Sequence, residues 1–156
     1  MPTRKSMSAV LLGIGVTLIA LGGVVGPVMK EQRAATERAA AMADLADIGK
    51  VVDAVLKRKP ALARDAQGEA LSYVHTEGKL PSNNVYASGP GAPLLEWFRA
   101  ANAPLIGADP WGHAYLVNLH SEGGSLSVLS AGPNGQVNTE PNAILPGGDD
   151  LLYVLD

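Results

Sequence analysis

Apolar residues fill one early stretch of this chain and alternate with polar residues in the rest. Residues 7–29 read MSAVLLGIGVTLIALGGVVGPVM and include no charged side chain. A run of this length forms a helix that spans the bilayer's hydrocarbon layer, about 30 Å thick, with its backbone hydrogen bonds closed internally. We therefore expect residues 7–29 to form a single transmembrane helix.

The next segment has the period of an amphipathic helix. Residues 30–60 are rich in Ala, Glu, Arg and Leu, which favour helix. Apolar side chains recur there at steps of four and three, so they share one stripe: Ala41, Leu45, Ile48, Val52 and Val55. Pro60 cannot continue the helix. The two segments together predict one rod about 80 Å long, at 1.5 Å per residue.

The segment after the rod is harder to interpret. Residues 61–78 are compatible with a short helix interrupted at Gly68, and residues 79–93 are rich in Pro, Asn and Gly, which predicts a surface loop. Residues 94–102 predict a second short helix. One side of that helix is expected to bury apolar side chains: Leu95, Trp97 or Phe98.

Strand patterns begin only after residue 112. Three apolar segments with alternating character, residues 113–119, 125–130 and 150–155, are separated by Gly-rich turns. This pattern predicts a small antiparallel meander. The expected fold class is α+β, with a long N-terminal helix followed by a globular domain over residues 61–156.

The flanks of the apolar run predict its orientation. Residues 1–6 form a short basic segment with Arg4 and Lys5, whereas the residues after the run carry mixed charge. The positive-inside rule then places the N-terminus in the cytoplasm and the rest of the chain outside it. A cleaved secretory signal has an apolar core of only about 7 to 15 residues, so the longer run here favours a retained anchor.

The overall charge argues against nucleic-acid binding. The chain has 12 basic and 15 acidic residues and a net charge of −3, and its acidic excess grows once Arg4 and Lys5 are set apart. A nucleic-acid footprint would be basic. Cysteine is absent, which removes disulfides, zinc–thiolate sites and cysteine nucleophiles.

No set of residues in the sequence predicts catalysis. The three histidines lack the close pairing of a zinc site: His75, His113 and His120. The serines within 125–130 lack a G-x-S-x-G motif, and no G-x-G-x-x-G follows a strand. We expect Trp97 to pack against the rod and Trp111 under its own turn. The chain is therefore not expected to be an enzyme.

Two C-terminal motifs, together with the order of the elements, resemble a known family. DPWGHAY occupies residues 109–115, SAGPNG occupies residues 130–135, and paired carboxylates follow at Asp149 and Asp150. With the apolar helix that continues as an amphipathic rod, the chain resembles the major pseudopilins of the type II secretion system and their relatives in the type IV pilin superfamily. The resemblance covers nearly the whole chain in order.

The resemblance implies a pilin-like fold and a structural role. The chain would be a single-pass protein of the bacterial inner membrane whose domain lies in the periplasm. It would polymerise with its own copies through the N-terminal helix, beside other pseudopilins and inner-membrane secretion components, into a filament that supports protein export. The alternative is a membrane-anchored binding or scaffold protein that carries a pseudopilin-like domain and does not polymerise.

The N-terminus departs from the family pattern. Family precursors carry a basic leader that ends in Gly, are cut after it, and have a Glu five residues into the mature chain. Matching Gly15 as the last leader residue makes Val16 the first mature residue and places Ala20 at the Glu position. Matching the proline of the membrane segment instead makes Ser6 the first mature residue and places Val10 at that position.

The resemblance also implies a bound cation in the C-terminal loop. In the family, acidic side chains and backbone carbonyls of this loop bind calcium, a hard cation that takes roughly six to eight oxygens. The favoured ligands here, with backbone carbonyls of residues 131–137, are Asn134, Asp149 and Asp150. An ungapped alignment would offer Glu140 and Asn142 instead. The structural alternative is that Asn134 only stabilises its turn and that the paired carboxylates are solvated residues before the last strand.

Overall fold

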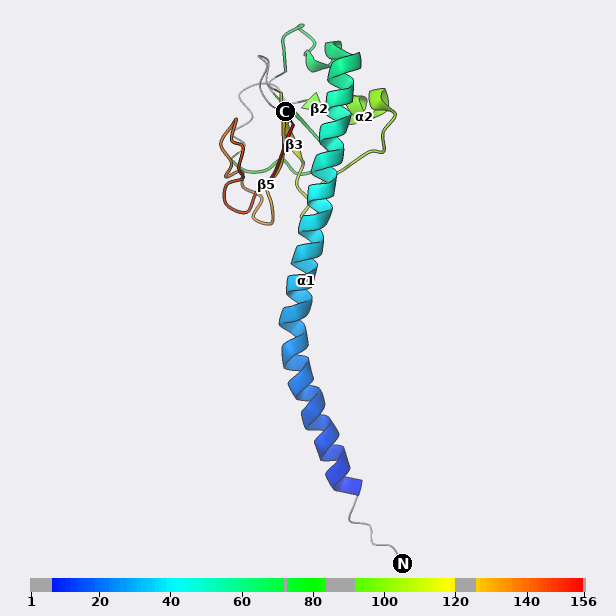
Figure 1. Cartoon of the computed structure of the whole chain (residues 1–156), viewed down its shortest axis with the longest axis vertical. Helices are drawn as coiled ribbons and strands as arrows, with labels where there is room; N and C mark the ends of the chain where they lie inside the picture. Colours follow the sequence, from blue (N-terminus) through cyan, green and yellow to red (C-terminus); the bar gives the residue numbers. More distant parts are fainter. Residues whose placement is uncertain (1–6, 72, 84–91, 120–125, 156) are drawn as a thin grey trace, which may run out of the picture. The chain divides into compact units, whose positions relative to one another are not determined.

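The computed structural model describes residues 7–71, 73–83, 92–119 and 126–155 of the 156-residue chain, and their side chains from residue 26 onward. Two compact units divide the chain, Met1–Glu37 and Arg38–Asp156. Helix α1, Met7–Arg58, contributes to both units (Figure 1). The single long helix expected from the sequence is confirmed, and it ends two residues before Pro60.

The first unit contains the N-terminal part of α1. Pro27 lies inside the helix, Val28 and Met29 are exposed, and Arg33 donates to Glu37 across 2.8 Å. Where side chains are described, no helix has an apolar stretch long enough to cross a membrane. The transmembrane prediction for residues 7–29 falls mostly outside those residues, and it stays a prediction.

The second unit uses the C-terminal part of α1 as one wall of its core. All five residues of the predicted stripe are buried, from Ala41 to Val55. Gly49 lies on the same side, and a Cβ there would meet the side chains of Tyr153 and Leu155. The missing side chain therefore lets the helix approach the last strand closely, which explains a glycine in the middle of a helix.

The polar side of α1 carries local ion pairs that suit an exposed helix surface. Asp47 accepts a 2.7 Å hydrogen bond from Lys50, which raises the pKa of this lysine, and Asp53 accepts one of 2.8 Å from Lys57. The N–H of Lys59 donates to the carbonyl of Val55, closing the last turn. Exposed pairs of this spacing contribute little to stability, because solvent screens them.

Five short strands form one mixed sheet. In chain order they are β1 Tyr73–His75, β2 Ala92–Pro93, β3 Leu116–Asn118, β4 Leu126–Ser130 and β5 Leu151–Leu155. Their order across the sheet is β2-β1-β3-β4-β5. The predicted meander of β3, β4 and β5 is confirmed, with Val128 of β4 opposite Val117 and Tyr153.

The two remaining strands correct the sequence prediction. β1 lies where a short helix was considered, and residues 61–78 instead hold β1 and a 3₁₀ turn, Pro60–Ala63. β2 lies in the predicted loop and pairs with β1 in parallel, so the sheet is not purely antiparallel. Strands of two and three residues are too short to show alternation. Pro93 fits because β2 is an edge strand, where a missing N–H is tolerated.

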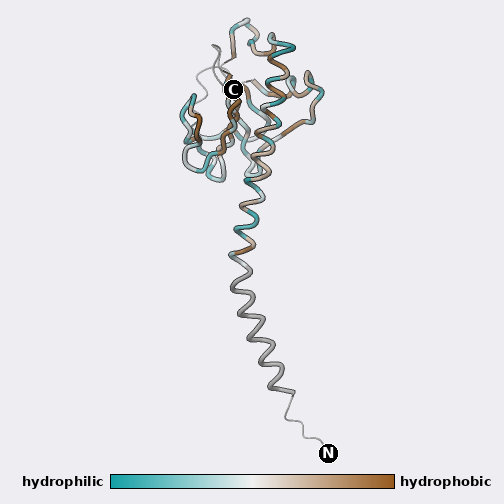
Figure 2. The backbone as a smooth tube through the Cα atoms, viewed as in Figure 1, coloured by the Kyte–Doolittle hydropathy of each residue, from teal (hydrophilic) through white to brown (hydrophobic). Residues whose placement is uncertain are grey.

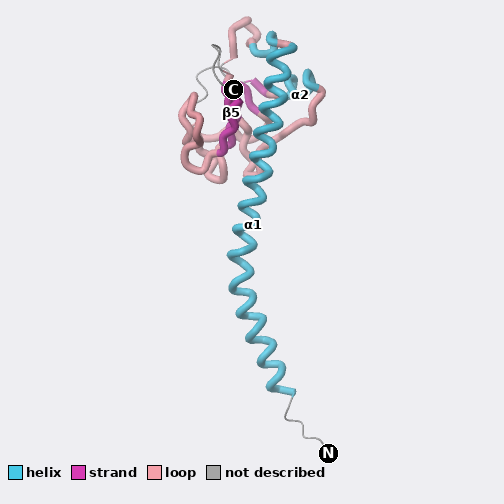
Figure 3. Tube along the Cα trace, in the orientation of Figure 1, coloured by secondary structure: helices cyan, strands magenta, loops and turns pink. Residues whose placement is uncertain are grey.

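The two faces of the sheet are covered by different material. Alternate residues Val74, Val117 and Val128 face the core built with α1 and the second helix, α2, Leu95–Ala101, which was predicted over 94–102. Both Trp97 and Phe98 of α2 are buried in that core. Figure 3 shows the strands with α1 on one side and loops on the other.

The other face is covered by the loop between β4 and β5. Its apolar cluster is small and contains Tyr73, Leu116, Leu129, Ala131 and Val137. Val137 is the loop's main apolar anchor, since Ile144 and Leu145 are about three-quarters exposed, at 75% and 74%. Figure 2 colours much of the neighbouring loops white or teal. Polar contacts must therefore organise this loop.

Candidate functional site

The DPWG turn is built around the buried carboxylate of Asp109. Its Oδ1 accepts hydrogen bonds from the backbone N–H of Trp111, at 3.0 Å, and of His113, at 2.8 Å. Gly112 has a φ of 91°, which glycine adopts without strain. Asp109 is only 4% exposed, so these charge-assisted bonds are needed to offset its burial.

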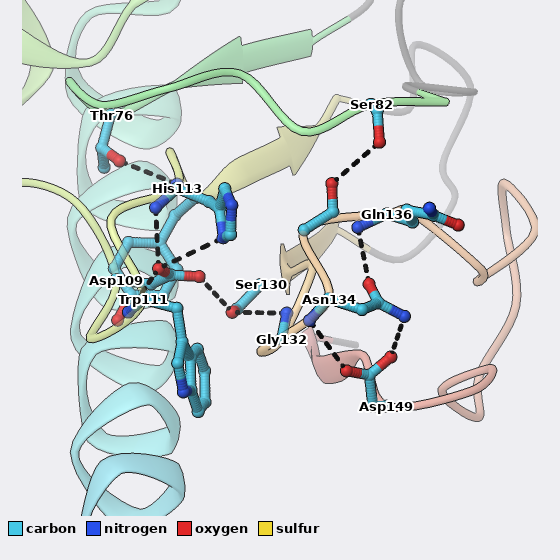
Figure 4. Close-up of polar contacts among 12 residues, drawn as sticks. Thr76, Ser82, Asp109, Trp111, His113, Ser130, Gly132, Asn134, Gln136 and Asp149 are labelled. Atoms are coloured by element: carbon cyan, nitrogen blue, oxygen red, sulfur yellow. Dashed lines mark hydrogen bonds and ion pairs between the residues drawn. The ribbon is translucent and has the colours of Figure 1, made fainter.

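The second motif is bonded directly to the first. The hydroxyl of Ser130, at the end of β4, donates to Asp109 Oδ2 across 2.7 Å and accepts the N–H of Gly132 at 3.2 Å (Figure 4). Asp109, Ser130 and Gly132 thus form one continuous buried chain of hydrogen bonds. The DPWG and SAGP motifs are two halves of a single structural unit.

The ends of the C-terminal loop meet at Gly132. This residue has a φ of 61°, and a Cβ at this position would collide with the backbone carbonyl of Asp149. Only glycine combines that φ with so close an approach. The start of the loop is therefore held beside the residue that precedes its final strand.

Asn134 and Asp149 form a paired contact beside this crossing. Asp149 Oδ2 accepts the backbone N–H of Asn134 at 3.1 Å, and the side-chain Nδ2 of Asn134 donates to Asp149 Oδ1 (Figure 4). Nδ2 also donates to Asn138 Oδ1 at 3.3 Å, while Oδ1 of Asn134 accepts the N–H of Gln136 at 2.6 Å. Every side-chain polar atom of Asn134 is engaged.

Asp150 holds a different part of the loop. Its Oδ2 accepts the N–H of Asn138 at 2.8 Å, and both the N–H and the hydroxyl of Thr139 at 2.7 Å. The Thr139 hydroxyl in turn accepts the N–H of Gly147 at 2.9 Å. Asp150 is 3% exposed, and its other oxygen, Oδ1, has no hydrogen-bond partner among the described residues.

The three predicted calcium ligands therefore do not share one set of partners. Asn134 and Asp149 bond to each other, whereas Asp150 turns to the backbone at residues 138–139. The alternative ligands are exposed turn residues: the carbonyl of Glu140 accepts the N–H of Ala143, and Asn142 has a φ of 69°. No group of three acidic or histidine side chains suited to a metal occurs in the part of the chain that the structure describes.

The predicted ligand oxygens, as they are arranged here, do not fit a calcium ion. Calcium takes roughly six to eight oxygens, and those oxygens must be free to face it. Here both oxygens of Asp149, the amide oxygen of Asn134 and Oδ2 of Asp150 already accept N–H or O–H donors. Oδ1 of Asp150 is the one carboxylate oxygen of this set without such a donor among the described residues.

Sequence reasoning missed the contacts that join distant segments. The N–H and hydroxyl of Ser82 both donate to the carbonyl of Gly135, at 3.0 and 3.1 Å, and the N–H of Val137 donates back to Ser82. This pairing clamps the loop to the segment after β1. The partners are 53 residues apart, and nothing in the local pattern around Ser82 signals them.

Tyr115 makes a second unforeseen connection, between the sheet and α1. Its side chain is fully buried, and its hydroxyl donates to Asp44 Oδ2 at 2.8 Å. Burial, reinforced by this hydrogen bond, raises the pKa of the Tyr115 phenol. Its backbone N–H also donates to the hydroxyl of Thr76 at 2.8 Å. Tyr115 belongs to the DPWGHAY motif, which therefore contacts the helix, the residue that follows β1, and β4.

The histidines and tryptophans occupy structural positions where they are described. His113 packs its ring against Gly135, with Nδ1 3.8 Å from Asp109, and His75 contacts the carbonyl of Thr76. Trp97 packs in the core with α1, as predicted, and Trp111 packs on the edge of the same core. His120 and Ser125 lie outside the described residues.

The predicted processing residues receive no test. Gly15 and Val16 lie in α1 within the part whose side chains are not described, and Ser6 lies outside the described residues. Searches with protein-family models, of curated proteins and of solved structures found no match.

Proposed function

We propose that this chain is a structural subunit of a pseudopilus or related pilin-like filament. In this proposal the N-terminal part of α1 is stored in the bacterial inner membrane and then packs against the same part of other copies. The globular unit lies in the periplasm and supports protein export by a type II secretion-type machine. The chain contributes no catalytic step.

The observation that carries the proposal is the bond between Asp109 and Ser130. The resemblance to pseudopilins rests chiefly on two short motifs, and short motifs taken separately are weak signals. Their side chains form one buried hydrogen-bonded unit at 2.7 Å, with Tyr115 of the first motif linked to α1. Two motifs that build one unit support a shared architecture better than two independent matches would.

The exposed surface of α1 from residue 26 to residue 40 gives additional support. Side chains from residue 26 to residue 40 are exposed, apart from partly buried Glu37. They include apolar Val28 and Met29 and a group of small residues: Ala34, Ala35, Ala39 and Ala40. Small side chains let helices approach one another closely. This surface suits packing against copies of the same helix.

Electron microscopy of sheared surface material tests the proposal. Cells that contain a type II secretion machine and overproduce the chain should yield thin filaments that bind an antibody against the globular unit. Ala39→Arg should abolish the filaments without unfolding the protein, because Ala39 is exposed. Ala66→Arg, the same change at an exposed turn, is the matched control and should leave them intact.

Mass spectrometry of the mature N-terminus separates the proposal from its alternative. A chain trimmed to begin near Ser6 or Val16 would support a filament subunit. An intact Met1, together with the absence of filaments in wild-type cells, would instead support a membrane-anchored scaffold protein that does not polymerise.

A further inference from the structure

The contact between Asn134 and Asp149 bears on how the C-terminal loop is held closed. Calcium was expected here from the resemblance, yet the oxygens that would bind it are occupied by donors from the chain itself. We infer that the side-chain amide of Asn134 takes the place of a divalent cation, so that this loop folds without metal. The inference does not depend on filament assembly.

The orientation of the Asn134 amide is fixed by its neighbours. The backbone N–H of Gln136 lies 2.6 Å from one end of the amide and needs an acceptor, so that end must be the oxygen. The nitrogen then faces the two remaining neighbours, Asp149 Oδ1 and Asn138 Oδ1, and both of these are acceptors. A reversed amide would set its nitrogen against the N–H of Gln136 and its oxygen against the carboxylate of Asp149, two unfavourable contacts.

The amide nitrogen therefore occupies the centre of a small oxygen cluster. Its two hydrogens carry partial positive charge and each faces an oxygen, one of which bears the charge of Asp149. The backbone N–H of Asn134 adds a third donor, to Asp149 Oδ2, at 3.1 Å. A cation in a loop of this kind would perform the same task, drawing oxygens of residues 138 and 149 together.

The rest of the loop is closed by contacts that also need no metal. Thr139 and the backbone at residues 138–139 satisfy Asp150 Oδ2, and Ser82 pairs with Gly135 and Val137. Gly132 brings the backbone against Asp149. The side chain at position 134 therefore determines whether the loop needs a cation to close.

Asn134→Asp is the most direct test, because it replaces the amide with a carboxylate of nearly the same shape. The variant keeps the acceptor for Gln136 but loses both amide donors and sets two carboxylates side by side. Repulsion between like charges should open the loop unless a cation binds between them. We expect the variant to melt several degrees below wild type in EDTA and to recover most of this loss in millimolar calcium.

Wild-type protein should behave differently in the same experiment. The full-length chain should show the same melting temperature in EDTA and in millimolar calcium, because the side-chain oxygens of Asn134 and Asp149 already accept donors from the chain itself. Gln67→Glu is the matched control, since it adds the same charge at an exposed turn outside this loop. Its melting temperature should also not respond to calcium.

Two results would overturn the inference. One is a wild-type melting temperature that rises with calcium but not with equal magnesium, which would mean that the loop binds calcium as it stands. The other is an Asn134→Asp variant that melts like wild type in EDTA. If that variant does not fold, calorimetric titration of the wild-type chain with calcium decides the question, since heat from a specific site would contradict the inference. Neither result bears on filament formation.

Discussion

Two buried carboxylates, Asp109 and Asp150, hold their loops with the same kinds of donor but not with the same completeness. Each accepts two backbone N–H groups and one hydroxyl, Ser130 for Asp109 and Thr139 for Asp150. Asp109 divides these donors between both oxygens. Asp150 receives all three on Oδ2, and its Oδ1 has no partner among the described residues.

The difference reflects what each carboxylate connects. Asp109 joins its own turn to the end of β4, 21 residues away, and thereby fixes the two motifs to each other. The donors to Asp150 come from two adjacent residues, Asn138 and Thr139, and organise only the loop that covers the sheet. We therefore expect Asp109 to contribute more to the stability of the domain than Asp150, which holds mainly the loop.

Asp109→Ala should cause the largest loss of stability. It leaves the buried hydroxyl of Ser130 without its acceptor and removes the partner of the Trp111 and His113 N–H groups. We expect the free energy of unfolding to fall by about 3 kcal/mol. Urea unfolding of the full-length chain in constant detergent measures it, and a loss no larger than that of Asp150→Ala would break the comparison.

Asp150→Ala should cost about 2 kcal/mol in the same assay. It also removes three hydrogen bonds, but it relieves the burial of the unpartnered Oδ1. Hydrogen exchange sharpens the contrast: the N–H groups of Asn138 and Thr139 should lose protection while those of β3 and β4 keep theirs. Uniform loss of protection over the sheet would show that Asp150 also holds the domain together.

Tyr115→Phe should have the smallest effect, about 1 kcal/mol near neutral pH, because it removes one hydrogen bond to Asp44 and keeps the buried ring. This variant extends the comparison to Asp44, a carboxylate on α1 rather than in a loop. A wild-type chain that is no more stable than the variant at neutral pH would show that this bond contributes nothing.

The same substitution makes a prediction about alkaline pH. Folding raises the pKa of Tyr115 above its ordinary value of 10.0, so the unfolded chain loses the phenolic proton first. The contribution of Tyr115 is therefore fully present below about pH 10 and is lost as pH rises further, by up to about 1.4 kcal/mol per pH unit. The free energy of unfolding of Tyr115→Phe should fall less steeply above that pH than that of wild type. Equal slopes for the two proteins would contradict a raised pKa for the Tyr115 phenol.

The sequence predicted those parts of the fold in which one pattern repeats over several turns or residues. The stripe from Ala41 to Val55 covers four helical turns, and β4 and β5 are five residues each, so their periods could be recognised. β1 and β2 could not be, because three and two residues show no period and their stability comes from pairing with neighbours.

The sequence predicted that Asn134 and Asp149 lie close together, but not that they bond to each other. Whether two such residues face a cation or each other depends on the direction of one amide, which the N–H of Gln136 sets within the folded loop. Contacts such as Tyr115 to Asp44, 71 residues apart, are equally a product of tertiary structure.

Disulfide cross-linking in membranes tests the central claim, that copies of α1 pack against one another, most directly. The chain has no cysteine, so Met29→Cys can be combined in turn with one further cysteine at each position from 30 to 40. Single-cysteine variants are the control and can form dimers only. The filament proposal predicts ladders well beyond dimers for pairs that lie on suitable faces of the helix, because head-to-tail contacts continue from copy to copy. If no pair gives more than a dimer while the protein remains folded and in the membrane, the proposal is contradicted.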